Sequence, residues 1–211
     1  MVDPPPEFES LVPLPRGRHA LSPEEVAANQ RARIATAIAS QTVEHGCDGL
    51  TVERVIEAAG VSRSTFYHHF ANKREALLAS HELIFGSLLD ELMAACGGEE
   101  EWPAKISAAV GAALDFAAAR PNQFSFLSVG SLIVDAGLAE RVIASHEQLA
   151  TLMSGLRQEA RADSATPECT ERFLVAGLGY VLASHLPEQG SDLTTLRGEL
   201  VELTLRVAFQ R

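Results

Sequence analysis

The chain has 211 residues, of which 46% are hydrophobic and 21% charged, and its formal net charge at pH 7 is −11. Such a chain is long enough to bury a sizeable core. No stretch approaches the roughly 18 charge-free apolar residues that a membrane span needs, and the N-terminus lacks the basic and apolar stretches of a signal peptide. We therefore expect a cytoplasmic protein with no membrane partner.

The three cysteines, Cys47, Cys96 and Cys169, are too far apart for a metal-binding pair and too few for a disulfide framework. We expect no metal, no cofactor and no catalytic residues. The acidic charge is uneven, because residues 1–80 have a net charge of −2 and residues 81–211 a net charge of −9. The overall charge therefore does not prevent one face near the N-terminus from contacting phosphate.

Helix start signals follow one another along the first half of the chain. Residues 1–21 are predicted to be a disordered, proline-rich tail with a basic end. Ser22, with Glu25 three residues later, predicts a helix that stops at Gly46. Three further helices are predicted, capped by Thr51, Ser62 and Asn72, and the last of them is long and reaches about residue 95.

Apolar residues at helical spacing continue through the second half, and no alternating strand pattern is present. Helices are predicted over residues 103–119, 138–162, 167–186 and 191–209, with a helix or irregular segment over residues 123–134. The prediction is an all-α protein of about nine helices. It has three parts: the tail (1–21), a helix-turn-helix domain (22–71) and a helical regulatory and dimerisation domain (72–211).

Two short helices joined by a turn at Gly60 are typical of a helix-turn-helix. Apolar residues on both helices and on the first helix predict a small core: Ile34, Ile38, Val55, Ile56, Ala59, Val61, Phe66 and Phe70. The side chains left outside on the second short helix are Arg63, Ser64, Thr65, Tyr67 and His68. They carry no carboxylate, and a helix start of this kind suits a DNA major groove and its phosphates.

The stretch TVERVIEAAGVSRSTFYHHFANKREAL, residues 51–77, resembles the DNA-binding signature of the TetR family of bacterial repressors. Where many members have Gly or Pro before the threonine, this chain has Ser64. The resemblance implies a dimer that binds a near-palindromic double-stranded DNA operator and is released by a small-molecule effector.

The resemblance also implies DNA-contacting roles. Arg63 would read a base edge, and Lys73 would pair with a phosphate. The implied set is Thr51, Ser62, Arg63, Ser64, Thr65, Tyr67, His68, His69 and Lys73. The basic tail end at Arg16, Arg18 and His19 is either a solvated end or an arm that reaches DNA.

Leucines spaced three and four residues apart near the C-terminus predict helix–helix packing with a second copy. The preceding apolar helix contains small residues that permit close approach. The predicted dimer interface is Phe173, Gly177, Val181, Leu193, Leu196, Leu200, Leu203 and Val207. The open alternative is a seam within one chain.

A cavity for a mostly apolar effector is expected between the middle helices. The candidate lining residues are Phe85, Leu89, Met93, Trp102, Phe116, Phe124, Leu127, Met153, Phe173 and Tyr180. Each is also suited to plain core. His81, His146 or Asp115 would supply a polar end.

Two other functions stay open. One is a TetR-like activator, or a DNA-binding protein regulated by a protein partner. The other, more distant, is an all-α enzyme, but the carboxylates of the second half lack the Glu-x-x-His spacing of helical metal sites.

Overall fold

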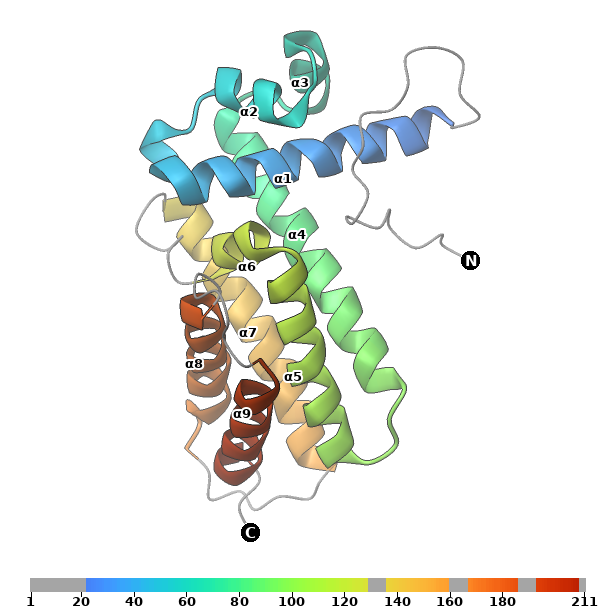
Figure 1. The fold of residues 1–211 in the computed structure, drawn as a ribbon, viewed down its shortest axis with the longest axis vertical. Helices are drawn as coiled ribbons and strands as arrows, with labels where there is room; N and C mark the ends of the chain where they lie inside the picture. Colours follow the sequence, from blue (N-terminus) through green and yellow to red (C-terminus); the bar gives the residue numbers. More distant parts are fainter. Residues whose placement is uncertain (1–21, 129–135, 160–166, 186–192, 209–211) are drawn as a thin grey trace.

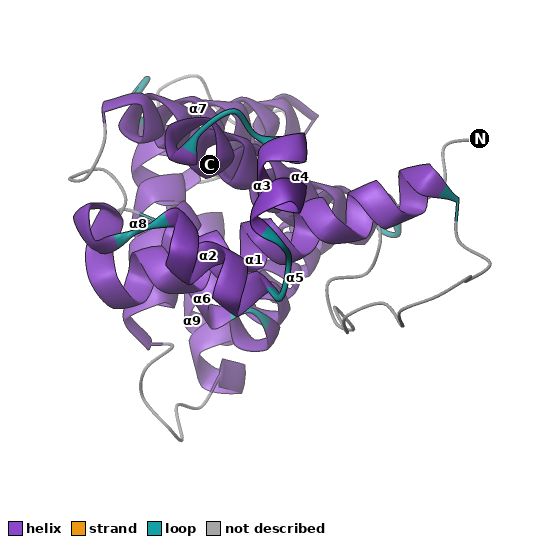
Figure 2. Ribbon diagram, turned by 90° about the horizontal axis from the view of Figure 1, so that it is seen from above, coloured by secondary structure: helices purple, strands orange, loops and turns teal. Residues whose placement is uncertain are grey.

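The computed structural model describes residues 22–128, 136–159, 167–185 and 193–208. In these ranges the regular structure is helical, in nine α-helices (Figures 1 and 2). They are α1 (Pro23–Gly49), α2 (Val52–Ala59), α3 (Arg63–His69), α4 (Lys73–Gly97), α5 (Trp102–Ala119), α6 (Pro121–Leu127), α7 (Ala136–Glu159), α8 (Thr170–His185) and α9 (Leu193–Ala208). The predicted all-α class is confirmed, whereas the predicted tail lies outside the described residues. No helix in these ranges combines the length and apolar character that a bilayer crossing requires.

The first four helices begin where the sequence predicts, because each has a side-chain cap. The Ser22 hydroxyl accepts a hydrogen bond from the Glu25 N–H, and the Glu25 carboxylate accepts one from the Ser22 N–H. Thr51, Ser62 and Asn72 each accept a hydrogen bond from the N–H three residues later. Each cap satisfies a backbone donor that the helix itself leaves unpaired.

Other helix boundaries differ from the prediction by a few residues. The first helix was predicted to stop at Gly46, but α1 continues to Gly49 across a non-helical Gly46 with φ +70°. Helix α6 begins at Pro121 rather than at Gln123, since proline fits the first helical turn and needs no N–H partner there. The rest of the segment predicted over residues 123–134 falls largely outside the described residues.

Helix α4 is the element shared by the two ends of the molecule (Figure 1). Its N-terminal half packs on α1, and further along it packs on α5, α6 and α7, while α6 also packs on α1. Helices α8 and α9 complete the body, against α7 and α5. The small α1–α3 core forms as predicted, with Ile34, Ile38, Val55 and Phe66 almost fully buried. At about 1.5–3 kcal/mol for each large apolar side chain, this burial fixes α2 and α3 on α1.

Candidate nucleic-acid interface and ligand cavity

A buried arginine on α1 contacts the turn of the helix-turn-helix. Gly60 adopts the left-handed conformation (φ +60°), which costs glycine little and other residues more. The Arg33 guanidinium, on α1, donates hydrogen bonds to the Ala59 and Gly60 carbonyls, the latter at 2.9 Å. Burial lowers the pKa of Arg33. These bonds satisfy two carbonyls at the end of α2 and set the direction in which α3 leaves the turn.

The outer face of α3 is polar and open to solvent. Arg63, Ser64, Tyr67 and His68 are exposed, and Thr65 is half-buried. The Ser62 hydroxyl lies 2.8 Å from the hydroxyls of both Ser64 and Thr65. The structure therefore brings these predicted residues together on one surface, at a helix N-terminus whose N–H groups favour anions.

One carboxylate reaches this surface from the neighbouring helix. Glu53, in the first turn of α2, forms an ion pair with Arg63. A backbone hydrogen bond at Glu53, followed by the charge of Arg63, lowers the pKa of the Glu53 carboxyl. The residue predicted to read a base is thus held by an acid in the free chain. The sequence alone did not identify this pairing.

Two residues predicted to contact DNA have hydrogen-bond partners within the chain. The His69 ring lies 2.8 Å from the Gln30 side-chain oxygen on α1, and burial is the main cause that lowers its pKa. The Lys73 ammonium donates hydrogen bonds to the backbone carbonyls of Leu50, at 2.8 Å, and Cys47, at 3.4 Å. Both side chains attach the start of α4 or the end of α3 to α1, which the local sequence does not reveal. Thr51 is exposed and serves as the α2 cap.

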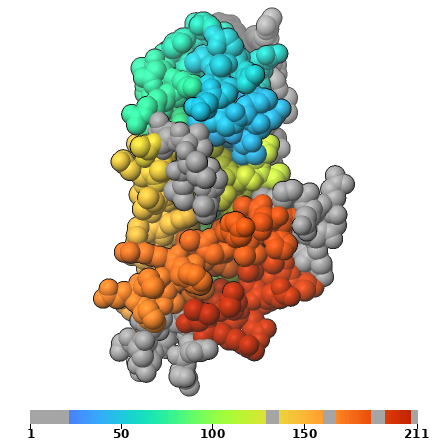
Figure 3. Space-filling view, turned by 90° about the vertical axis from the view of Figure 1, so that its left-hand side faces the viewer, coloured from blue at the N-terminus to red at the C-terminus, as the bar shows by residue number. Residues whose placement is uncertain are grey.

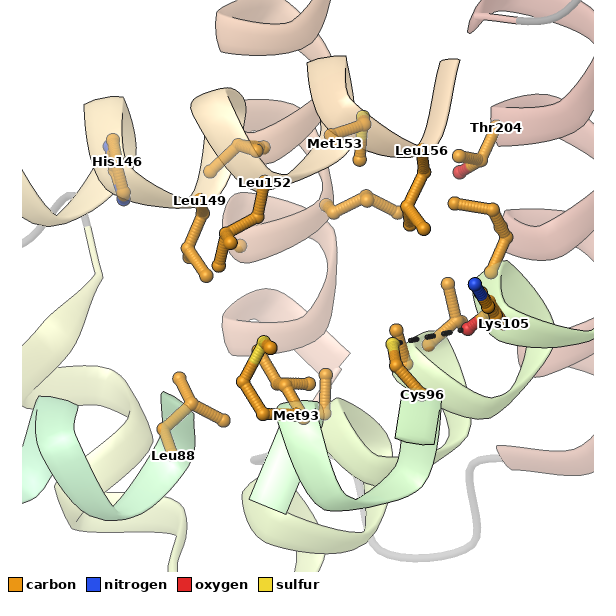
Figure 4. Close-up of a pocket in the computed structure, with 18 of the residues that line it drawn as sticks. Leu88, Met93, Cys96, Lys105, His146, Leu149, Leu152, Met153, Leu156 and Thr204 are labelled. Atoms are coloured by element: carbon orange, nitrogen blue, oxygen red, sulfur yellow. Dashed lines mark hydrogen bonds between the residues drawn. The ribbon is translucent and has the colours of Figure 1, made fainter. Parts of the chain in front are cut away.

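A cavity of about 580 Å³ lies between α4, α5, α7 and α8, with α6 against it (Figure 4). Its walls are mainly apolar. Of the predicted lining residues, five do line it: Phe85, Met93, Phe124, Leu127 and Met153. Leu92, Ile106 and Leu149 also line it and were not predicted.

The other five predicted lining residues lie elsewhere. Phe116 is fully buried beside Phe124 and under the Arg120 guanidinium, so it is core. Leu89 and Trp102 pack on the same core. Phe173 and Tyr180 lie on the outer face of α8, with 73% and 64% of their surface exposed. All five are apolar at helical spacing, and that spacing alone does not say which neighbour a stripe meets.

A buried histidine adjoins the cavity. His81, on α4, is 1% exposed, and its ring stacks on Phe85 with centroids 6.3 Å apart. Burial, followed by the charges of Arg141 and His146, lowers the pKa of His81 to about 4. It is therefore neutral at pH 7. Asp115, by contrast, is exposed and points to solvent.

The residues predicted for the dimer interface divide between two environments. Phe173, Leu203 and Val207 are exposed, whereas Leu196 and Leu200 are buried in their own chain, where α9 packs on α5. Gly177 and Val181 are half-buried. Leu193 begins α9, but its side chain lies outside the described residues. The regular leucine spacing thus serves, in part, a seam within one chain.

Among the described residues, no group of three or more His, Cys, Asp or Glu side chains is placed to hold a metal ion. The polar residues gather instead on the α3 surface, and the apolar space lies in the helical body. The structure thus joins an exposed polar helix surface to a helical body that contains an apolar cavity.

Comparison with known proteins identifies the N-terminal part. Residues 34–79 match the family model of bacterial regulatory proteins of the tetR family. This part of the chain is a TetR-family domain. The HTH-type transcriptional repressor AcnR of Corynebacterium efficiens is 50% identical over 36 residues. That match covers 17% of this chain and 19% of AcnR, so the chain matches about a fifth of this relative's length.

Solved structures share the fold over most of the chain. The fatty acid degradation regulator FadR from Bacillus halodurans has a TM-score of 0.71 and 18% identity, covering 89% of this chain and 97% of FadR. FadR from Bacillus subtilis, solved in complex with stearoyl-CoA, has a TM-score of 0.66 and 17% identity, covering 82% and 96%. At this identity the similarity establishes the fold of the second domain.

Proposed function

We propose that this TetR-family protein is a dimeric, ligand-responsive repressor that binds a near-palindromic DNA operator. The observation that carries the proposal is the position of α4. Helix α4 begins beside the helix-turn-helix formed by α2 and α3, and further along it lines the apolar cavity with Phe85, Leu88 and Met93. One rigid element of roughly 37 Å therefore touches both the DNA-facing domain and the chamber.

For DNA binding, we assign residues 22–71 as the reading domain and residues 72–211 as the regulatory domain. Arg63 is proposed to contact a base edge, because arginine pairs well with guanine in the major groove. The remaining proposed contacts to phosphate or sugar are Thr51, Ser62, Ser64, Thr65, Tyr67 and His68. His69 and Lys73 are proposed to position α3 and α4 through their bonds to α1.

For dimerisation, the supporting feature is an uncovered apolar surface on α8 and α9. Figure 3 shows these two helices forming much of the lower part of one face. Phe173, Tyr180, Leu203 and Val207 are exposed on them. Large exposed aromatic and aliphatic side chains mark protein contacts. A two-fold dimer through this surface would present two α3 helices to the two half-sites of an operator.

For regulation, the cavity volume falls within the range of small-molecule sites. The stearoyl-CoA complex of Bacillus subtilis FadR, which shares this fold, supports a small-molecule effector, and its long acyl chain is apolar. A ligand releases DNA only if it favours a state in which the two reading helices are wrongly spaced. A shift of α4 would change that spacing.

The test is selection of binding sites from a random duplex library with the purified protein, at about 0.1 M salt because salt sets the affinity. We expect enrichment of a near-palindrome, and loss of that enrichment for Arg63→Ala. Asp115→Ala on α5, an exposed residue outside the α3 surface and the proposed dimer surface, is the control and keeps the enrichment. A folded, dimeric protein that enriches no sequence would refute the proposed operator binding.

A further inference from the structure

The cavity has two chemically different ends (Figure 4). Lys105, Cys96 and Thr204 lie at one end, and His146 lies at the other, with leucine and methionine side chains between them. Ser145 precedes His146 on α7 and also lines the cavity. An elongated ligand therefore has a choice of two orientations, and the polar groups at the two ends decide between them.

At the Lys105 end, the polar groups already have partners. The Lys105 ammonium lies 2.8 Å from the Glu159 carboxylate, which pairs its charge. The Cys96 thiol contacts the Lys105 backbone carbonyl at 3.6 Å, and the Thr204 hydroxyl donates to the Leu200 carbonyl at 2.7 Å. A polar ligand group at this end would have to break one of these contacts.

At the other end, two polar side chains are unused. Ser145 is 8% exposed and His146 is half-buried, and neither the Ser145 hydroxyl nor the His146 ring forms a side-chain hydrogen bond with a residue that the structure describes. Both residues line the cavity, so a polar group of a ligand can reach them. A ligand group that pairs with both would gain two hydrogen bonds, whereas an apolar group would gain none.

The electrostatics of this end favour an uncharged group. Burial alone lowers the pKa of His146, so the ring is neutral at pH 7. On the neighbouring helix His81 is neutral too, and the nearby Arg141 forms an ion pair with Glu82. A ligand carboxylate or ammonium placed here would be desolvated with no unpaired opposite charge beside it.

We propose that the cavity takes an elongated apolar molecule whose single uncharged hydroxyl lies between Ser145 and His146. A hydroxyl both donates and accepts, as do the serine hydroxyl and the neutral imidazole. At about 30 Å³ for each water-sized group, the cavity holds a molecule of about 20 non-hydrogen atoms. Long-chain alcohols fit this description. The inference rests on the proposed ligand response and specifies its chemistry.

The experiment measures displacement of N-phenyl-1-naphthylamine, a neutral fluorescent probe, from the full-length protein. Dodecan-1-ol and dodecanoate compete at pH 8 against wild type, the double variant Ser145→Ala/His146→Phe, and Lys105→Met. We expect dodecan-1-ol to compete better than dodecanoate with wild type. The double variant should weaken the alcohol about tenfold, as expected for two lost hydrogen bonds, and leave probe binding within about twofold. Lys105→Met, at the opposite end, should leave the alcohol unchanged.

Two results separate the possible failures. If dodecanoate competes better and Lys105→Met abolishes its advantage, the polar group lies at the Lys105 end and this inference is overturned, while the proposed ligand response stands. If neither the probe nor the alcohol binds folded wild type, both the hydroxyl assignment and the proposed ligand response at this cavity are refuted. Should the double variant not fold, Ser145→Ala alone carries the test with an expected weakening of about threefold, and an unchanged affinity refutes the assignment.

Discussion

Replacing Gly60 by alanine tests whether Arg33 holds the helix-turn-helix in shape. An alanine at φ +60° costs about 1–2 kcal/mol by its backbone conformation alone. Its Cβ would also lie 2.7 Å from an Arg33 guanidinium nitrogen, which is anchored by the two carbonyls at the end of α2. Displacing that guanidinium forfeits one of these hydrogen bonds from a charged donor, about 1.5–3 kcal/mol. Gly60→Ala should therefore cost about 3–5 kcal/mol in total.

The same change should be milder when the arginine is absent. In an Arg33→Ala background the clash disappears, so Gly60→Ala should cost only the 1–2 kcal/mol of backbone strain. The two substitutions should thus be coupled by about 2 kcal/mol. Urea unfolding of the four proteins, followed by circular dichroism at one protein concentration, measures this coupling. Arg31→Ala, an exposed arginine on the same helix, is the control and should show none. Additive costs for Gly60→Ala and Arg33→Ala would refute the anchoring role.

Three further outcomes are expected. The pKa of His81 is lower in the folded than in the unfolded chain, so its contribution to the free energy of unfolding is complete above pH 6.5 and falls by about 3 kcal/mol as the pH drops towards 4. The urea midpoint should therefore fall less steeply between pH 7 and 4 for His81→Leu than for wild type. Parallel curves would contradict this. Arg63→Ala should weaken operator binding about 10- to 100-fold and relax the preference for one base. Glu53→Gln, which removes the paired charge, should strengthen binding to any duplex about threefold, as measured by fluorescence anisotropy at fixed salt. Weaker binding of Glu53→Gln would show that the carboxylate positions Arg63 for DNA. Arg157→Met should destabilise the protein by about 3 kcal/mol, because it leaves the buried Glu171 carboxylate unpaired. Arg206→Met, which breaks an exposed ion pair, should cost less than about 1 kcal/mol in the same urea assay. Equal costs would show that burial of the ion pair does not matter.

The local sequence predicts the helices and the reader well, because both depend on short-range chemistry. Ser22, Thr51, Ser62 and Asn72 each bond an N–H three residues away, so their effect is visible in any short window. The apolar spacing of α2 and α3 likewise determines which side faces α1, and therefore which side chains remain outside. This is why the exposed face of α3 is predicted correctly at Arg63.

Long-range polar partners are not predictable in the same way. His69 bonds Gln30, 39 residues earlier, and Lys73 bonds the Leu50 carbonyl, 23 residues earlier. Sequence spacing contains no information about these pairs, because they depend on how α1 crosses the later helices. A histidine and a lysine beside a helix-turn-helix are therefore assigned to DNA by default, although their hydrogen bonds are within the chain.

Apolar residues present a related difficulty. Phe116 and Phe173 both occupy apolar stripes, yet one is fully buried and the other 73% exposed. Periodicity identifies a stripe but does not say whether core, cavity or a second chain covers it. The cavity itself depends on side chains from several helices leaving a space unfilled, which only the packed structure reveals.

Helix α4 packs on α1 near its start and lines the cavity further along, and this has an evolutionary consequence. The family match ends at residue 79, in the second turn of α4, where the helix still packs on α1. Beyond that point α4 faces the chamber, and the solved relatives retain the fold at 17–18% identity overall. Substitutions on α5, α7 and α8 change the chamber without touching the reader. Under the proposed function, new effector specificities can therefore arise while the DNA-binding helices α2 and α3 stay the same, and only changes in α4 and α6 must satisfy both parts of the molecule at once.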